Sequence, residues 1–362
     1  MNKKELYIGV MSGTSLDGVD VALCEIDTES CILVHSKEYP FDEKLKEEIL
    51  SAISGSVTLE IVGTLDHKLG CLFSEAILSF LSDFSLKAED INAIGVHGQT
   101  LWHAPDSKNP FSMQLGDANI VVSKTDIQTI ADFRRMDIAN GGQGAPFAPA
   151  FHQFLFGNLK GFNAVVNIGG MANITLLGKK LFGWDSGCGN VLLDYWVREN
   201  AYKPYDYNGE FAKSGVVNED LLELMLSDVY FKKSAPKSTG REYFNSMWLE
   251  EKLSAFSLLK VEDVQRTLLE LTARTIADDL EGKRVDRLIV CGGGAKNRFL
   301  MQRLDMLTSC SVKSSEHVGV DGDALEAMAF AWLAYKRKHR EEVDLKSVTG
   351  AKKNSLLGAI YG

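Results

Sequence analysis

The sequence lacks the short motifs by which several common enzyme classes are identified. It contains no GxxxxGK[ST] phosphate-binding loop, and no GxGxxG segment follows a strand-like stretch. HExxH and GxSxG are also absent. These absences argue against P-loop ATPases, dinucleotide-binding domains, HExxH metalloproteases and hydrolases with a GxSxG nucleophile.

Paired cysteines and long apolar runs are missing as well. The six cysteines show no CxxC spacing and lie mostly among apolar neighbours, which is typical of buried thiols in a reducing compartment. The apolar stretch at residues 6–10 is too short for a signal-peptide core, and no apolar run reaches membrane-spanning length. We therefore expect a soluble, cytoplasmic protein.

Positive charge is in deficit. Lys and Arg number 39 against 49 Asp and Glu, which gives a formal net charge of −10. This balance argues against nucleic acid as a partner, because a nucleic-acid surface has to replace counterions with basic side chains. A small anionic substrate remains compatible with it, since a few local arginines can hold a carboxylate or a phosphate.

Length and composition indicate two folded domains. At 362 residues, with 45% hydrophobic and 24% charged residues, the chain is longer than one core usually supports and has an ordinary globular composition. We place the boundary at the start of a Gly- and Pro-rich stretch around residues 125–144. The predicted N-terminal lobe is 1–128, rejoined by 340–362, and the C-terminal lobe is 129–339, with a cleft between them.

The hydrophobic pattern predicts an α/β protein with an internal duplication. An antiparallel meander at residues 6–10, 19–27 and 31–39 precedes helices at 43–53 and 59–81 and a buried strand at 91–96. A second meander runs through NAVVNIGG, NITLLG and KLFGWDSG. The remainder is mostly helical around one buried strand, RLIVCGGG, with helices at 191–200, 219–226, 246–256, 264–280 and 324–340. Each half should hold a mixed sheet flanked by helices.

Three Gly-rich turns follow apolar strands: MSGTSLDG, NIGGMAN and CGGGAKN. Glycine permits positive φ and lets backbone N–H groups converge on an anion, so such turns can hold phosphates without a P-loop. In the first turn Ser12, Thr14 and Ser15 add donors, and Asp17 and Asp20 are suited to hold Mg²⁺ directly or through water. Ordinary hairpin turns and a tight strand-to-helix connection use the same residue types. The turns alone indicate only an ATP-binding, two-lobed protein.

Two carboxylates are candidates for catalysis. Asp185 in GWDSGCGN ends a short apolar strand before two glycines and a helix, so it would project into the cleft beside helix N-terminal amides as a general base. Glu326 in DALEAMAF starts a helix and is suited to orient water or sugar. The alternatives are a helix cap for Asp185, and a cap or surface charge for Glu326.

Eight segments, in order through nearly the whole chain, resemble the anhydro-N-acetylmuramic acid kinases: MSGTSLDGVD, HGQTLWHAP, ADFRRMDIANGGQGAPFAPAFH, NIGGMANIT, WDSGCGN, PKSTGREYFN, CGGGAKN and DGDALEAMAFAWLA. The resemblance implies the superfamily of actin, hexokinase and the heat-shock chaperone ATPases, with a two-lobed actin-like, ribonuclease H-like fold. It implies that ATP, Mg²⁺ and water convert 1,6-anhydro-N-acetylmuramic acid to N-acetylmuramic acid 6-phosphate in cell-wall peptidoglycan recycling. A homodimer is a further expectation at the level of the family.

The resemblance also implies roles for site residues. Asp185, with Glu326, would activate the water that attacks the anomeric carbon, and the released O6 would attack the γ-phosphate of ATP. Arg134, with Arg135 as the fallback, would pair with the lactyl carboxylate of the sugar. Further sugar contacts would come from the HGQTLW segment through His97, Gln99, Thr100 and Trp102. Two phosphate loops and one adenosine loop would contact the nucleotide through Ser12, Gly13, Thr14, Ser15, Leu16, Asp17, Gly18, Val19, Asp20, Gly169, Gly170, Asn173, Gly292, Gly293, Gly294 and Asn297.

Other functions stay open at this point. An actin-like ATPase acting on a protein partner would share the turns and the acidic charge, although the HGQTLW and ADFRR segments argue against it. A glycosidase using Asp185 and Glu326 as its carboxylate pair would leave three phosphate-type turns unexplained. A kinase for another sugar is a further alternative. Cys188 stands where we expect proline in the family motif, which puts in doubt the rigidity of that loop and its resistance to oxidation.

Overall fold

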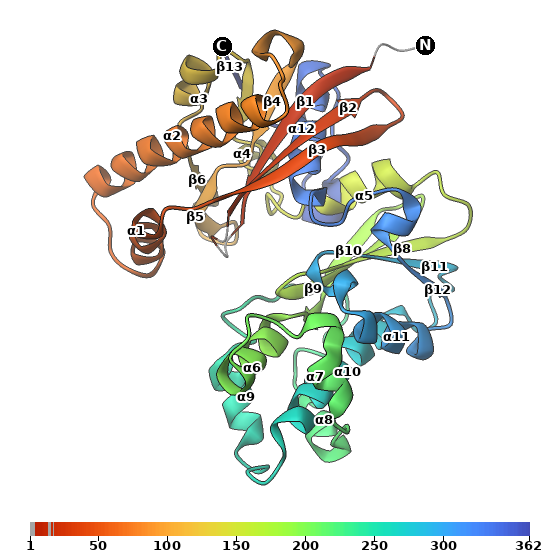
Figure 1. Ribbon diagram of the computed structural model, residues 1–362. Helices are drawn as coiled ribbons and strands as arrows, with labels where there is room; N and C mark the ends of the chain where they lie inside the picture. The colour runs from red at the N-terminus through yellow and green to blue at the C-terminus, as the bar shows by residue number, and fades with distance from the viewer. Residues whose placement is uncertain (1–3, 14–15, 17) are drawn as a thin grey trace. The chain divides into compact units, whose positions relative to one another are not determined.

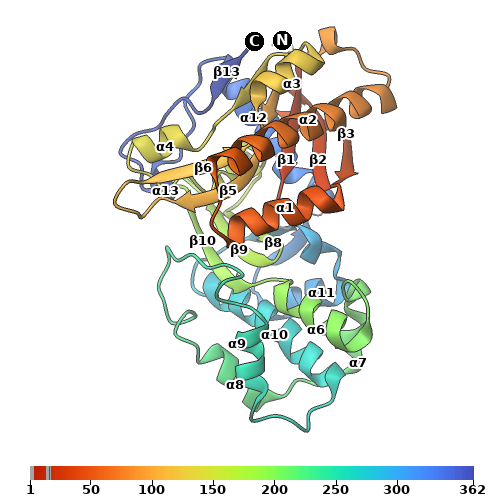
Figure 2. The same ribbon diagram turned by 90° about the vertical axis from the view of Figure 1, so that its left-hand side faces the viewer.

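The computed structural model describes residues 4–13, 16 and 18–362, and it contains two compact units (Figures 1 and 2). The first unit consists of Met1–Leu155 and Ala324–Gly362, and the second of Phe156–Asp323. Among the residues described, no helix is both long enough and apolar enough to cross a membrane.

A mixed six-stranded sheet forms the centre of the first unit. Its strands are β1 (Glu5–Ser12), β2 (Gly18–Ile26), β3 (Cys31–Pro40), β4 (Ala93–Val96), β7 (Thr129–Ala131) and β13 (Ala359–Tyr361). β1, β2 and β3 form the predicted antiparallel meander, whereas β4 runs parallel to β1 and β7 parallel to β4. The order across the sheet is β13-β7-β4-β1-β2-β3.

Helices cover both faces of this sheet. The other elements formed by this part of the chain are α1 (Glu43–Ser54), α2 (Leu59–Asp83), the 3-10 helix η1 (Ala88–Asp90), the hairpin of β5 (Gln99–Ala104) and β6 (Phe111–Leu115), α3 (Ala118–Thr125), α4 (Arg135–Ala139), α5 (Ala148–Phe156), α12 (Leu325–Lys338) and α13 (Lys346–Thr349). Ile8 and Val10 of β1 share a core with α1 and α2, which lie over one face of the sheet (Figure 2). Gly9 points to the other face, where a Cβ would lie 1.8 Å from the carbonyl oxygen of Ala327. Glycine at this position is what lets α12 pack directly on the strands.

The second unit is built on a five-stranded sheet. Its strands are β8 (Asn163–Ile168), β9 (Met171–Leu177), β10 (Phe182–Cys188), β11 (Arg287–Cys291) and β12 (Ser311–Ser314). β8, β9 and β10 form an antiparallel meander, while β11 runs parallel to β8 and β12 parallel to β11. The order is β10-β9-β8-β11-β12.

The helices of the second unit share one hydrophobic core with these strands. They are α6 (Val191–Ala201), η2 (Tyr207–Gly209), α7 (Glu210–Ser214), α8 (Glu219–Leu226), α9 (Ser246–Leu253), α10 (Val261–Leu280), η3 (Gly293–Lys296), α11 (Arg298–Leu307) and η4 (Ser315–Val318). Buried side chains of α10, such as Leu268 and Leu271, meet Val166 of β8 and Leu300 of α11 in that core.

The two sheets repeat one arrangement. In each, an antiparallel meander of three strands is extended beside its first strand by two strands that run parallel to it. This is the ribonuclease H-like order, and its repetition is the mark of the actin-like fold. The predicted fold class, an α/β protein of two compact parts with duplicated mixed sheets flanked by helices, is confirmed.

The compact units divide the chain at other places than the predicted lobes. β7 lies beyond residue 128, yet it pairs with β4 and β13, so the first unit continues to Leu155. α12 packs on β1, so the chain returns to the first unit at Ala324 and not at residue 340. Both differences have the same cause, because hydrophobic periodicity marks an element without showing the sheet on which it packs.

Candidate active site

Two glycine turns of the second unit interlock at one end of its sheet. Gly169 and Gly170 join β8 to β9, and Gly189 and Asn190 follow β10. The backbone N–H groups of Gly189 and Asn190 donate to the carbonyl oxygens of Gly170 and Gly169 at 2.9 and 2.8 Å. A Cβ at Gly189 would lie 2.4 Å from the carbonyl oxygen of Gly169. The end of the Asp185 strand is thereby fixed to the predicted phosphate turn, and only glycine allows the contact.

The third turn, Gly292 to Gly294, packs on the same end of β8. Gly292 has a φ of 76°, and a Cβ there would lie 2.3 Å from Oδ1 of Asn167. A Cβ at Gly294 would lie 2.4 Å from Cγ2 of Ile168. Packing therefore explains the outer two glycines. At Gly293 an added Cβ would meet only Asn190, at 3.6 Å, so this glycine is the one left open to a ligand.

A cavity of about 310 Å³ opens beside Gly293. It is lined by the first residues of α6, by residues 205–208 and by the turn that ends at Asn297, so two of the predicted nucleotide contacts face it. Burial raises the pKa of Asp194 in its wall to about 6, although the charges of Arg198 and Arg241 oppose the rise. The volume lies within the range of small-molecule sites. No motif pointed to Asp194, and its place on the first turn of α6 was the only signal.

Asp185 lies in β10 opposite Asn173 of β9, next to a bulge. Its Oδ2 accepts hydrogen bonds from Oγ of Ser238 at 2.9 Å and from the backbone N–H of Thr239 at 3.0 Å. Burial raises the pKa of the carboxyl, and Glu242 adds to the rise, while the Thr239 and Ser238 bonds lower it. Asp185 is no cap of α6, whose N-cap is Asn190. A half-buried carboxylate with a raised pKa is suited to take a proton.

The backbone of Asp185 is fixed as firmly as its side chain. Its N–H donates to the carbonyl oxygen of Lys237 at 2.9 Å, and the hydroxyl of Tyr230 donates to its carbonyl oxygen at 2.7 Å. The Lys237 side chain is buried beside Asp279. Ser238 and Thr239 were not predicted as partners of Asp185; the available signal was two hydroxyl residues before a glycine, in a stretch with no helical or strand period.

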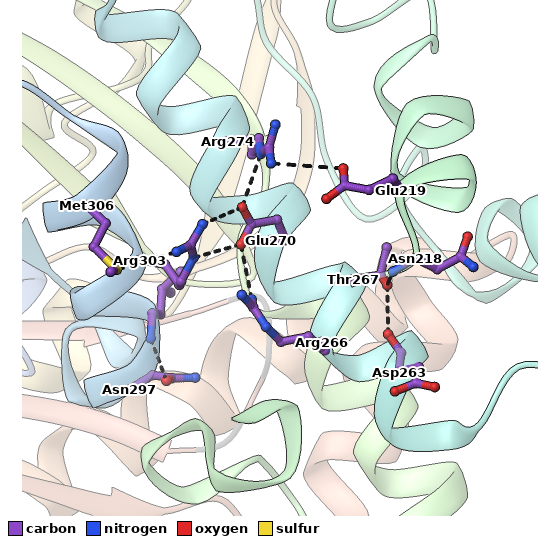
Figure 3. A network of polar contacts seen from close by, with 11 residues as sticks. Asn218, Glu219, Asp263, Arg266, Thr267, Glu270, Arg274, Asn297, Arg303 and Met306 are labelled. Carbon is purple, nitrogen blue, oxygen red and sulfur yellow. Dashed lines mark hydrogen bonds and ion pairs between the residues drawn. The ribbon is translucent and has the colours of Figure 1, made fainter. Parts of the chain in front are cut away.

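Glu270 and three arginines join α10 to α11 (Figure 3). The Glu270 side chain is 1% exposed and accepts from Arg303 at 2.8 and 2.9 Å and from Arg266 and Arg274 at 3.1 Å. Burial alone would raise the pKa of Glu270, but the hydrogen bonds and charges of the arginines lower it to about 2. Because α11 begins at Asn297, this network anchors the helix that follows the triple-glycine turn.

The first unit brings together two of the predicted sugar contacts, Arg134 and His97, with the candidate catalytic carboxylate Glu326 nearby. Arg134 donates through Nε and Nη2 to Nε2 of His97 at 3.3 and 2.8 Å, and through Nη1 to the carbonyl oxygen of Gly144 at 2.9 Å. Burial, and then the charge of Arg134, hold the pKa of His97 well below its usual range, so the imidazole is neutral and accepts. Burial lowers the pKa of Arg134 to about 10, against the charge of Glu326.

Glu326, the second candidate catalytic carboxylate, lies at the start of α12. It is within electrostatic reach of Arg134. Its side chain is open to solvent. The pKa of Glu326 is nevertheless raised, because protein atoms crowd around the carboxyl and reduce its solvation, while Arg134 pulls the pKa down. The fallback Arg135 differs, since its exposed side chain pairs with Asp132 at 2.7 Å.

The remaining HGQTLW residues do not form one group. Gln99 is buried and accepts from the hydroxyl of Ser12 at the end of β1. Thr100 accepts from Nε2 of Gln114 at 3.1 Å in the β5–β6 hairpin. Trp102 is 60% exposed, and its ring lies 6.1 Å from the ring of Phe111 in the same hairpin, tilted by 45°.

The β1–β2 connection carries the other predicted nucleotide contacts. Leu16 is buried, and its N–H donates to the carbonyl oxygen of Gly13 at 3.2 Å. Asp20 lies opposite Met11 on the face of β2 that α12 covers, because Gly9, two residues before Met11, points to α12. Gly18 and Val19 are buried at the start of β2. The predicted residues Thr14, Ser15 and Asp17 lie outside the described residues.

A preformed metal cage is not found in the part of the chain that the structure describes. There, no three His, Cys, Asp or Glu side chains are grouped so as to hold an ion. Cys188 is buried, and burial raises its pKa to about 12, so its thiol is in an inert environment.

Comparison with known proteins assigns the chain to a family. The family model described as anhydro-N-acetylmuramic acid kinase matches residues 5–362. Relatives of that name from Sulfurovum sp. (strain NBC37-1) and Sulfurimonas denitrificans are 56% and 53% identical, each over 99% of both chains. One from Pasteurella multocida is 50% identical over 98% of this chain and 96% of its own. Among solved structures, the chain is similar to the activator of the 2-hydroxyisocaproyl-CoA dehydratase from Clostridium difficile with bound ADPNP. The two are 13% identical with a TM-score of 0.47, over 94% of this chain and 96% of that chain. The chain belongs to the anhydro-N-acetylmuramic acid kinase family.

Proposed function

We propose that this chain is an ATP-dependent kinase that opens 1,6-anhydro-N-acetylmuramic acid with water and phosphorylates O6. The products are N-acetylmuramic acid 6-phosphate and ADP, in the recycling of cell-wall peptidoglycan. The family match and the relatives of that name support the substrate. The carrying observation is the Asp185 carboxylate, held by Ser238 and Thr239 in the strand that interlocks with the Gly169–Gly170 turn.

One base serves both halves of the reaction. Asp185 takes a proton from water as the water oxygen bonds to the anomeric carbon, and the bond from that carbon to O6 breaks with its electron pair going to O6. O6 then bonds to the γ-phosphorus of ATP. The bond from phosphorus to the bridging oxygen breaks, and its electron pair leaves with ADP. The proton on Asp185 is released to solvent, which balances the reaction.

Arg134 is suited to the lactyl carboxylate because its guanidinium is held but not saturated. Three of its five N–H groups are used on His97 and Gly144, which leaves two for a bidentate pair with a carboxylate. The neutral His97 fixes the orientation without adding a competing charge. Glu326 orients the water or the sugar from the start of α12, and Gln99, Thr100 and Trp102 supply further sugar contacts.

ATP is held by the turns, with Mg²⁺ on its phosphates. In the second unit, Gly293 and Asn297 face the cavity that would take the nucleoside, and the Gly169–Gly170 turn would take phosphates. In the first unit, the β1–β2 connection is the other candidate for a phosphate contact. Asp17 and Asp20 would hold Mg²⁺ directly or through water. Mg²⁺ is usually held by one or two carboxylates together with substrate phosphates and water, and these two side chains with ATP would supply such a donor set. When bound, it neutralises charge on the phosphates.

The setting we propose is the cytoplasm, with the enzyme as a homodimer. All six cysteines are free, which suits a reducing compartment. Light scattering should give twice the chain mass of 39.9 kDa. A monomer mass at enzyme concentrations would remove the dimer from the proposal.

Incubation with Mg-ATP and the anhydro sugar in ¹⁸O-water tests the reaction. Mass spectrometry should find the label at the anomeric hydroxyl and none in the phosphate ester, with a parallel reaction in ordinary water as the reference. Absence of a phosphorylated product contradicts the proposal. A product phosphorylated but still anhydro would leave a kinase and exclude coupled ring opening.

A further inference from the structure

The short segment from Lys237 to Arg241 lies against two parts of the second unit, the strand of Asp185 and the Gly169–Gly170 turn. Its first residues hold Asp185, through the carbonyl oxygen of Lys237, the hydroxyl of Ser238 and the N–H of Thr239. Two residues after Thr239, Arg241 lies against the Gly169–Gly170 turn, since a Cβ at Gly170 would be 3.4 Å from both Nε and Nη2 of the guanidinium. The candidate base and a cation are thus placed by one stretch of chain.

Arg241 has no bonded anionic partner among the residues that the structure describes. Its side chain is exposed, and it makes neither a hydrogen bond nor an ion pair with any described residue. The arginines of the Glu270 network show the contrast, because each is bound to that carboxylate. The N–H of Gly170 also donates to no described residue. Among the described residues, neither the guanidinium nor the neighbouring backbone N–H has a hydrogen-bond partner, and donors of these two kinds close together favour an oxyanion.

The charge of Arg241 extends toward the cavity beside Gly293. It is one of two arginines whose charges lower the pKa of Asp194 in the cavity wall. Arg241 thus lies beside the Gly169–Gly170 turn and within electrostatic reach of a carboxyl in the wall of the cavity that would hold the nucleoside. In ATP, the atoms between the nucleoside and the reacting oxygen are the phosphates.

We propose that Arg241, together with the Gly169–Gly170 turn, binds the γ-phosphoryl group of ATP during its transfer, as an arginine finger supplied by the chain itself. This inference rests on the proposed kinase function. As the bond from O6 to phosphorus forms and the bond to the bridging oxygen breaks, negative charge is spread over the phosphoryl oxygens and the leaving oxygen of ADP. Arg241 supplies a positive charge and two parallel donors to those oxygens.

The other reading of Arg241 is a mere counter-ion of Asp194, and Arg198 provides the matched control. Arg198 lies one helical turn after Asp194 in α6 and likewise lowers its pKa, so Arg198→Ala removes a cation of the same kind beside the same carboxylate. If Arg241 served only as a counter-ion of Asp194, Arg198→Ala and Arg241→Ala would change kcat and nucleotide binding to the same extent.

The experiment compares Arg241→Ala, Arg241→Lys and Arg198→Ala in the full chain. Steady-state kinetics give kcat and KM, and calorimetric titration without sugar gives the Kd for ADP and for a non-hydrolysable ATP analogue. For Arg241→Ala we expect kcat to fall at least about 100-fold. The analogue should bind about 10-fold more weakly, and ADP should change less than about 3-fold. Arg241→Lys should recover part of kcat, because it keeps the charge without the fork. Arg198→Ala should stay within about 3-fold in every quantity.

Three results overturn the inference: equal weakening of ADP and the ATP analogue, the same losses in Arg198→Ala, or a near-normal kcat in Arg241→Ala. The titrations need no sugar, so they separate this inference from the proposed function. Suppose that the wild-type chain does not phosphorylate the anhydro sugar but binds the ATP analogue more tightly than ADP, and that Arg241→Ala has lost this preference. The proposed kinase reaction is then wrong, and the assignment of Arg241 stands.

Discussion

In the first unit, β4 is followed by His97, a buried side chain bound to Arg134, whereas at the equivalent place in the second unit β11 is followed by three glycines, Gly292 to Gly294. The hairpins differ in the same way. In the sequence, five residues separate the end of β1 from the start of β2, whereas only two glycines separate β8 from β9. The two sheets share one arrangement, but the segments that follow their strands differ. In the first unit these segments carry functional side chains, and in the second unit they are mostly glycine. Side chains discriminate a carboxylate on a sugar, while bare backbone allows phosphates to approach N–H groups closely.

The largest effect should come from the one carboxylate among the glycine turns of the second unit. Asp185→Asn keeps the shape of the side chain but cannot take a proton, so kcat should fall about 10³-fold or more. The Kd for ADP should stay unchanged, because the cavity beside Gly293 does not include Asp185. Stopped assays of product formation and calorimetry measure the two quantities. Near-normal turnover would remove Asp185 as the base.

A buried charge network around Glu270 joins α10 to α11 in the second unit. Glu270→Gln should lower the free energy of unfolding by roughly 3 kcal/mol, because three arginines lose a buried partner. The folded pKa of about 2 lies below the ordinary 4.5, so this stability is full above about pH 4.5 and is lost as the pH falls toward 2. Urea unfolding at pH 7 and pH 4 measures both effects.

Glu219→Gln is the matched control for the network. Glu219 is 64% exposed and lies 4.0 Å from Arg274, so its removal should cost less than about 0.5 kcal/mol. Equal losses in the two variants would mean that the burial of Glu270 contributes nothing.

Gly189→Ala tests whether the close packing of the glycine turns in the second unit is needed. In Gly189→Ala the new Cβ would meet the carbonyl oxygen of Gly169 at 2.4 Å, so we expect a loss of about 1–3 kcal/mol in stability together with lower kcat. In Gly63→Ala, within α2, no atom lies within 4 Å of the new Cβ, and the better helix propensity should add about 0.5–1 kcal/mol. Thermal unfolding of both variants checks the contrast, which disappears if Gly189→Ala is neutral.

The sequence revealed the strands and the glycine turns because each has a local signature. Both meanders and α10 appear as apolar runs or helical periods, and they lie close to the predicted residues. The partners of Asp185 could not be read in this way, since Ser238 and Thr239 follow it by more than 50 positions and belong to a segment with no period. The same applies to β7, whose short pattern does not tell which sheet it joins, and to the split of the HGQTLW residues between a buried group and an exposed hairpin.

A substitution of Arg134 tests whether the side chains of the first unit bind the carboxylate of the sugar. Arg134→Ala should raise KM for the anhydro sugar about 10–100-fold, because a charge-assisted pair with the lactyl carboxylate is lost. KM for ATP should change less than about 3-fold. Arg135→Ala, which removes an exposed partner of Asp132, should leave both values near those of the wild type. Equal rises for both substrates in Arg134→Ala would indicate a general folding defect in place of lost sugar binding.

The smallest effect should be a shift in pH dependence from Ser238→Ala. The Ser238 hydroxyl donates to the ionised form of Asp185 and so lowers the pKa of the carboxyl, against the rise caused by burial. Without it the pKa of Asp185 should rise only a little further, since the Thr239 N–H bond remains. Asp185 must be ionised to act as the base, so the acid limb of kcat should move to higher pH by that amount, with little change at high pH. Ser227→Ala, which removes a hydroxyl bonded only to the carbonyl oxygen of Leu224, should leave the profile in place. A shift toward lower pH in Ser238→Ala would show that the hydroxyl does not stabilise the charged base, and the stabilisation of the Asp185 carboxylate would then come from the backbone N–H of Thr239 alone.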